Sequence, residues 1–144
     1  MPELFKYLKS VMPLNAMVNF VFDPETNLVR IRSMRTGSFS IQPDKWITIS
    51  KSSKAFFNRR YKRNVLNVDD LRKTPLNDGI LSFFNKQLDR NLGSAILIRM
   101  FSEEKKVGIS GLIAEGYNRY SDEHVDLVEV LSKRIGSQCY PGKF

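Results

Sequence analysis

The chain has 144 residues, 42% of them hydrophobic and 26% charged, with a formal net charge of +8, which suits one folded domain and excludes a largely disordered protein. No apolar run approaches the roughly 20 residues that cross a bilayer, and the N-terminal segment lacks the apolar stretch of a signal peptide. The single cysteine, Cys139, excludes an internal disulfide, so we expect a cytoplasmic protein in which this side chain is a small, partly buried apolar group.

The first part of the chain predicts a helix followed by a β-hairpin. Apolar residues at helical spacing indicate a helix over 3–12, which Pro13 ends. Residues 15–23 and 28–35 are rich in β-branched and aromatic side chains, and the segment DPETN at 23–27 is typical of a turn. Two strands joined by a short turn predict an antiparallel pair.

Charged and apolar residues alternate in the second strand of this hairpin. Arg30 and Arg32 share one face, whereas Val29 and Ile31 share the other. This alternation is typical of a sheet with one solvated side, so we expect the two arginines to face solvent. A loop over 35–44 follows.

The middle of the chain predicts short elements. Residues 46–50 indicate a third strand, and Ser52 or Ser53 is placed to cap a helix over 54–61. Residues 64–68 indicate another short extended piece.

The second half predicts a helix and then a second hairpin. Residues 69–79 are irregular, and 80–91 carry apolar residues on one side of a helix. The segments 94–101 and 107–116 indicate two strands joined by a charged connection at 102–106.

The last predicted element is a helix that begins after Ser121. Serine is a favoured N-cap, and Asp122 and Glu123 in the first turn suit the helix dipole. The predicted strands come in hairpins rather than in βαβ units, so the sequence predicts a single α+β domain over 1–144 with an antiparallel sheet.

Positive charge is concentrated in one segment. Residues 45–68 contain seven Lys or Arg and no Asp or Glu, so they carry +7 of the net +8. Helical projection places Phe57 and Tyr61 on one ridge and most of the bases opposite, with Phe56 among them, where arginine stems could cover it. This segment has three interpretations: its basic face is solvated, it contacts another protein or domain, or residues 51–63 form a nucleic-acid-binding surface.

The sequence offers no constellation for catalysis. The one histidine, His124, has no evident nucleophile or orienting carboxylate, so we expect it to be a surface residue of the last helix. No Cys/His group has metal-ligand spacing, and no glycine-rich phosphate loop is present. We therefore expect no enzyme activity, no catalytic residue, no metal and no cofactor.

The C-terminal segment resembles the end of a GAF domain. The resemblance is carried by VGISGLIAEGYNRYSDEHVDLVEVLSKRIG, in which a strand with small residues leads to an aromatic residue, a serine, acidic residues and a final helix. The family's strand, helix, basic turn and short strand are similar to ITISKSSKAFFNRRYKRNVLNVDD, and its opening helix and hairpin resemble LFKYLKSVMPLNAMVNFVFDPETNLVRIRSM.

A narrower resemblance is to the N-terminal sensory GAF domains of bacterial sigma-54-dependent transcriptional activators, which is carried by VMPLNA, DPETNLVRIRSM and LIAEGYNRYSDEH. The resemblance implies a sheet with the terminal helices on one face and, on the other, a ligand pocket closed by a lid region at about 45–92. It also implies AAA+ ATPase and DNA-binding output domains in a longer regulator, and a homodimer through the terminal helices.

Four residues are candidates for ligand binding within this resemblance. Trp46 and Phe57 fall in the lid region and are expected pocket walls. Arg99 shares a strand face with apolar residues, so it could pair with a carboxylate or phosphate of the ligand, and Ser110 on the next strand could fix the ligand's orientation. A structural Arg99 that extends to solvent at a sheet edge is the alternative.

The ligands and chemistry of several GAF subfamilies do not fit the residues present. Members that bind cyclic nucleotides share a signature with a Phe at one position, and Asn118 stands at that position here. Members that bind bilins carry a cysteine in the pocket region, whereas Cys139 lies in the last helix. Members that reduce free methionine sulfoxide use several cysteines, and the ligands of the iron-binding nitric oxide sensors have no counterpart here.

We therefore expect a small-molecule-sensing or regulatory domain of a transcriptional regulator, which controls an attached output domain without catalysis, direct nucleic-acid binding or membrane binding. The alternatives are a nucleic-acid-binding module that uses residues 51–63, and a ligand-free dimerisation scaffold. The sequence identifies neither the ligand nor the direction of regulation.

Overall fold

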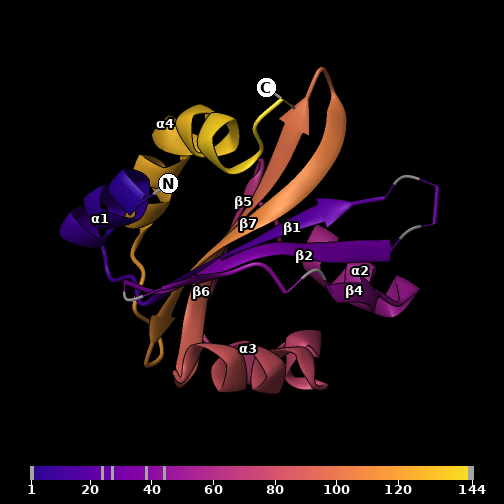
Figure 1. Cartoon of the computed structure of the whole chain (residues 1–144), viewed down its shortest axis with the longest axis horizontal. Coiled ribbons are helices and arrows are strands. Elements are labelled where there is room, and N and C mark those ends of the chain that lie inside the picture. The colour runs from indigo at the N-terminus through magenta and orange to yellow at the C-terminus, as the bar shows by residue number, and fades with distance from the viewer. Residues whose placement is uncertain (1, 24, 27, 38, 44, 143–144) are drawn as a thin grey trace.

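An antiparallel sheet of seven strands forms the centre of the computed structural model, which describes residues 2–23, 25–26, 28–37, 39–43 and 45–142 (Figure 1). In chain order the elements are α1 (Pro2–Val11), β1 (Ala16–Phe22), β2 (Leu28–Arg35), β3 (Ser40–Ile41), β4 (Lys45–Thr48), α2 (Lys51–Asn58), β5 (Val65–Val68), the 3-10 helices η1 (Leu71–Lys73) and η2 (Pro75–Asn77), α3 (Ile80–Leu88), β6 (Leu92–Ser102), β7 (Lys105–Glu115) and α4 (Asp122–Cys139).

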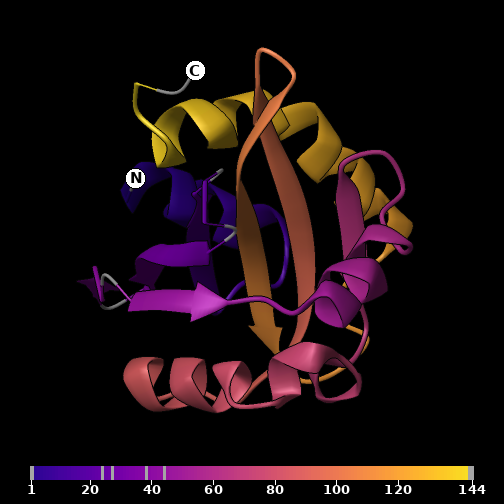
Figure 2. The ribbon, with the colours of Figure 1, turned by 90° about the vertical axis from the view of Figure 1, so that its right-hand side faces the viewer.

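Helices cover both faces of the sheet. The strand order is β3-β2-β1-β7-β6-β5, with β4 also paired to β2, and every pairing is antiparallel. Figures 1 and 2 show α1 and α4 together on one face, whereas α3 lies on the other. The hairpins β1–β2 and β6–β7 and the segregated helices confirm the predicted α+β class.

Two apolar cores follow from the two covered faces. We call the core between the sheet and the helices α1 and α4 the helix-side core, and Leu8, Ile98 and Ile135 are fully buried in it. We call the core on the opposite face, which includes Leu97 of β6 and Phe84 of α3, the lid-side core, because the predicted lid region lies on that face. Because side chains alternate across a strand, successive residues of β6 point to opposite faces and belong to different cores.

The lid helix α2 begins three residues earlier than the sequence predicts. Its N-cap is Ser50, whose side chain accepts a hydrogen bond from the backbone N–H of Ser53 at 3.1 Å. The prediction of Ser52 or Ser53 as the cap is therefore wrong, because an earlier serine already satisfies the first free N–H groups. The predicted loop at 35–44 also contains β3, a two-residue strand.

Other local predictions are confirmed. Val29 and Ile31 are buried, whereas Arg30 and Arg32 are partly exposed. Ser121 caps α4 in a capping box. In the predicted turn at 23–27, the Asp23 side chain accepts hydrogen bonds from Glu25 and Thr26, while the predicted turn residues Pro24 and Asn27 lie outside the described residues. None of the helices that the structure describes is both long and apolar enough to span a membrane.

Candidate functional site

The lid-side face of the sheet is largely filled by the protein's own side chains. Leu81, Phe84 and Leu88 of α3 are buried against it, and the rings of Phe20 and Phe84 lie 5.9 Å apart. Open space is present toward the margin of this face, where α2, β4 and the η2–α3 segment meet.

A cavity of about 320 Å³ lies at this margin, and we call it the lid cavity. Its apolar walls include Phe57 of α2, Ile47 of β4 and Leu76 of η2, while Ser53 and Asp78 contribute polar groups. The complete lining is Ile47, Thr48, Ile49, Ser50, Ser53, Phe57, Pro75, Leu76, Asp78 and Ile80. An apolar hollow with a few polar groups is the usual form of a small-molecule site.

Trp46 lines a neighbouring hollow rather than the lid cavity. This hollow has a volume of about 360 Å³ and shares four lining residues with the lid cavity, namely Ile47, Thr48, Asp78 and Ile80. Trp46 lies opposite Arg30 in the β2–β4 ladder, so the two side chains share a face, and the indole is 49% exposed. Phe57 and Trp46 thus line adjacent hollows that both border the lid region.

Arg99 lies on the lid-side face of β6, beneath the segment that follows α2. Its Nη2 donates a hydrogen bond to the carbonyl oxygen of Arg63, and its Cζ lies 4.3 Å from the centroid of the Tyr61 ring. The Arg99 Nε is buried without a hydrogen-bond partner among the described residues, and so is the Tyr61 hydroxyl, whose pKa burial raises. Arg99 therefore combines a structural contact with an unused donor.

Two further cations lie near Arg99. Burial lowers the pKa of Lys106, and the positive charges of Arg99 and Lys54 lower it further. The Lys106 ammonium lies 4.4 Å from the centroid of the Phe22 ring. Neither lysine forms an ion pair within the part of the chain that the structure describes, so this end of the lid side is strongly positive.

Ser110 lies on the opposite face of the sheet from Arg99. In the β6–β7 ladder Ser110 pairs with Ile98, whereas Arg99 pairs with Ile109, so the two candidates point to different faces. The Ser110 hydroxyl is buried and donates to the Asn19 Oδ1 at 2.7 Å. The expectation that Arg99 and Ser110 line one pocket is therefore wrong, and Ser110 belongs to the helix-side core.

The helix α2 ends at Asn58 rather than at the predicted residue 61, and the basic residues that follow it lie outside the core. Phe57 and Tyr61 pack against the lid-side core, while Arg59 and Arg60 are exposed. The Arg60 guanidinium covers the Phe56 ring with Cζ 3.6 Å from its centroid. The aromatic residue on the basic face is therefore already covered.

The structure gives His124 and Cys139 local structural roles. His124 Nδ1 accepts a hydrogen bond from the Ser121 backbone N–H at 3.1 Å, which completes the capping box of α4. Cys139 is buried, and burial raises the pKa of its thiol to about 12. Within the described ranges, no three or more His, Cys, Asp or Glu side chains gather where they could hold a metal ion.

Sequence reasoning missed most of the lid cavity. Ile47 lies between exposed residues of β4, and this alternation is a sequence signal that could have indicated its inward-facing side chain. Leu76 and Asp78 come from a segment without helical or strand periodicity, so no pattern places them near Phe57.

Comparison with known proteins identifies the fold. No protein-family model matches the chain, and no curated protein matches it. The far-red absorbing dark state of JSC1_58120g3 with bound biliverdin IXa is similar at TM-score 0.66 and 12% identity, over 97% of this chain and 87% of that one. The GAF domain of a two-component sensor histidine kinase from Bacillus halodurans is similar at TM-score 0.61 and 14% identity, over 92% and 86%.

A third similar structure is the type II free methionine-R-sulfoxide reductase from Thermoplasma acidophilum, with TM-score 0.58 and 11% identity over 92% of this chain and 83% of that one. At these identities the likeness shows the fold alone. The chain has the fold of a GAF domain.

Proposed function

We propose that this protein is a small-molecule-sensing domain that regulates an attached output domain, and that it performs no chemistry itself. The observation that carries the proposal is the lid cavity, a concave apolar site on the lid side of a GAF fold, with Phe57 as one wall. One structure with the same fold holds biliverdin, which is a precedent for a bound small molecule.

Ligand binding would act through the lid region. A ligand that contacts Phe57 and Ile47 favours the lid arrangement in which those walls are in place, and it shifts the equilibrium by its difference in affinity between the two arrangements. Arg63, just beyond α2, already pairs with Glu129 of α4 at 2.7 Å. A change in the lid therefore has a direct route to the C-terminal helix.

The proposed context is a cytoplasmic bacterial transcriptional activator of the sigma-54-dependent class, with AAA+ and DNA-binding output domains. The sequence segments VMPLNA and LIAEGYNRYSDEH support this context by resemblance. The proposal includes a homodimer through α1 and α4, because exposed apolar side chains on these helices suit a helical interface.

A thermal-shift screen of metabolites, nucleotides and carboxylic acids tests the proposal. A compound that binds the folded protein raises its melting temperature, because it binds the folded state alone. Arg99 is not among the residues that line the lid cavity, so Arg99→Ala should leave most of the shift of a compound bound there unchanged. A screen in which no compound raises the melting temperature favours the ligand-free scaffold instead.

A nucleic-acid-binding module that uses residues 51–63 is the second candidate. The exposed side chains of Arg59 and Lys62 favour it, since neither forms an ion pair in the described part of the chain. The covered ring of Phe56 counts against base stacking. This candidate predicts retardation of DNA or RNA at low salt that weakens steeply with added salt, and it fails if the domain retards neither.

A further inference from the structure

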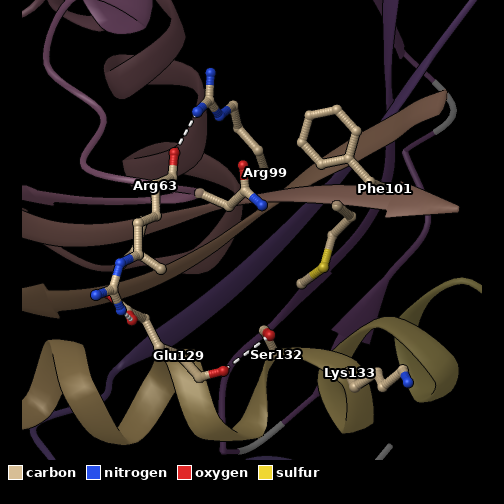
Figure 3. A pocket seen from close by; sticks show the side chains of 9 residues that line it. Arg63, Arg99, Phe101, Glu129, Ser132 and Lys133 are labelled. Atoms are coloured by element: carbon tan, nitrogen blue, oxygen red, sulfur yellow. Dashed lines mark hydrogen bonds and ion pairs between the residues drawn. The ribbon is translucent and has the colours of Figure 1, made fainter. Parts of the chain in front are cut away.

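Three cations line a hollow beside α4, but they do not act on one point (Figure 3). Arg63 lies toward Glu129 and pairs with it at 2.7 Å, whereas Arg99 points away from α4 (Figure 3). The ammonium group of Lys133 points in a third direction (Figure 3). Because these charged groups point apart, they do not form a joint anion site.

A different hollow lies between β2 and the C-terminal end of α4, and we call it the arginine hollow. It has a volume of about 290 Å³, and its described lining shares no residue with the lid cavity. Two arginines of β2, Arg32 and Arg35, line it together with Gln138 of α4. The described lining is Arg32, Ser33, Arg35, Ser40, Gln42, Gln138, Cys139 and Pro141.

A β-bulge places the two arginines on the same face of β2. In an unbroken strand, residues three apart point to opposite faces. Here Arg32 is an extra residue between Ile31 and Ser33, which pair with successive residues of β1, so the alternation shifts by one. Arg35 lies opposite Met17, a residue of the helix-side core, and therefore faces the helix side.

Arg32 also points to the helix side, toward the end of α4. Burial raises the pKa of the Cys139 thiol, and the positive charge of Arg32 counteracts part of that rise. Cys139 belongs to the helix-side core and lines the arginine hollow. The bulge therefore brings two guanidinium groups to one small hollow.

The described lining of the arginine hollow is positive and contains no carboxylate. Neither Arg32 nor Arg35 forms an ion pair with any residue that the structure describes. The Ser33 hydroxyl accepts a hydrogen bond from the Asn19 amide at 3.0 Å, so its own proton can still be donated. Ser40 of β3 lies directly opposite Arg35 and adds a second hydroxyl on the same face.

We propose that the arginine hollow binds a phosphate group, either as the free ion or in a phosphomonoester, between Arg32 and Arg35. Guanidinium groups bind phosphate oxygens with paired N–H donors. The hydroxyls of Ser33 and Ser40 and the amide of Gln138 are neutral donors for the remaining oxygens. Two cations without a carboxylate give a net charge of +2, which a phosphate dianion neutralises.

The C-terminal end of α4 opposes an anion at this place, because the helix dipole carries partial negative charge there. A hydrogen bond from a charged group is the larger effect, and the hollow offers two guanidinium groups. A bound phosphate would bridge β2 and the end of α4. The site goes beyond the proposed sensing function, and it stands even if the lid cavity binds nothing.

Titration with inorganic phosphate in a phosphate-free buffer, followed by nuclear magnetic resonance of the backbone amides, tests the proposal. We expect saturable shifts around the arginine hollow, and a parallel titration with phenyl phosphate distinguishes a phosphomonoester from the free ion. Arg32→Gln and Arg35→Gln should each weaken phosphate binding about tenfold, since each removes one charge-assisted contact. Lys86→Gln on α3, an exposed lysine away from the hollow, removes the same charge and should leave the affinity unchanged.

Substitutions of Gln138 make the test independent of folding defects. Gln138→Lys adds a cation to the hollow, so phosphate should bind about threefold or more tightly, whereas Gln138→Glu should weaken binding by a similar factor. Loss of folded protein cannot produce a gain of affinity. The proposal is overturned if Gln138→Lys does not tighten binding, if Lys86→Gln weakens it as much as Arg35→Gln, or if the amides around the hollow do not shift up to about 50 mM phosphate.

Discussion

The Tyr140 hydroxyl ties the end of α4 to two strands. It lies 2.8 Å from the carbonyl oxygen of Phe20 in β1 and 2.9 Å from that of Ile109 in β7. Gly108 allows this approach, because a Cβ there would lie 2.1 Å from the Phe20 oxygen and 2.7 Å from the tyrosine ring. The side chain is fully buried, so its hydroxyl has no access to water as an alternative partner.

We predict that Tyr140→Phe lowers the free energy of unfolding by about 1–3 kcal/mol, because it removes a donor from buried carbonyl groups. The urea midpoint should fall with an unchanged slope. Tyr7→Phe is the control, since the Tyr7 ring is 40% exposed and its change should stay within about 0.5 kcal/mol. Equal effects of the two substitutions would contradict the role of the buried hydroxyl.

The candidate residues show what a sequence pattern can place and what it cannot. Phe57 was predictable because helical projection separates it from the basic side chains. The faces of Arg99 and Ser110 were not, because β6 and β7 are apolar on both faces and their alternation does not mark which side a residue takes. Only the pairing of Arg99 with Ile109 and of Ser110 with Ile98 separates them.

At the scale of elements, the N-cap of α2 decides where the lid helix begins. Ser50, Ser52 and Ser53 all lie near its start, so residue type alone does not choose among them. We predict that Ser50→Ala destabilises α2 by about 1 kcal/mol and speeds amide hydrogen exchange along that helix. Ser52→Ala should leave the exchange rates nearly unchanged, and the reverse ranking would contradict Ser50 as the cap.

The turn between β6 and β7 is strained. Glu103 and Glu104 both have left-handed backbones, with φ of 52° and 67°, although asparagine and glycine are the residues that favour this two-residue turn. We predict that Glu103→Asn combined with Glu104→Gly raises the free energy of unfolding by about 1–2 kcal/mol. Replacing both residues by alanine removes the charges but keeps the strain, so it should give no such gain in the urea midpoint.

Helices and hairpins were the most predictable elements. The periodicity, the N-cap and the charges of the terminal helix after Ser121 all agree. The predicted strand 94–101 is longer at both ends in the structure, and the predicted strand 107–116 begins two residues earlier and ends one residue earlier. The irregular segment 69–79 could not be interpreted, because its two 3-10 helices depend on local side-chain caps at Asp70 and Thr74 rather than on a repeating pattern.

At the scale of the whole molecule, the outer surface of α1 and α4 exposes apolar side chains. Val130 is 80% exposed, Tyr7 40% and Val11 39%. If the protein forms the proposed homodimer through these helices, Val130→Glu should convert it to a monomer in analytical ultracentrifugation, since the charge would be buried in the interface. Ser82→Glu on α3 is the control and should remain dimeric; a wild-type protein that stays monomeric at all concentrations contradicts the dimer.

The two hairpins were predictable because β1–β2 and β6–β7 pair as sequence neighbours, whereas the central β1–β7 pairing joins strands that are far apart in the sequence. The lid cavity was not predictable, because its walls come from β4, α2, η2 and α3, and their meeting depends on long-range packing. The Arg63–Glu129 contact likewise joins residues far apart in the sequence that no local pattern relates.

The most direct test of the sensing function is whether a stabilising compound needs the lid cavity. Ser53→Phe places a ring into the cavity, whereas Ser52→Phe places the same ring on an exposed position of the same helix. We predict that a compound from the thermal-shift screen raises the melting temperature of the wild type and of Ser52→Phe equally, and fails to raise that of Ser53→Phe. An equal rise in all three proteins would contradict the lid cavity as the sensing site.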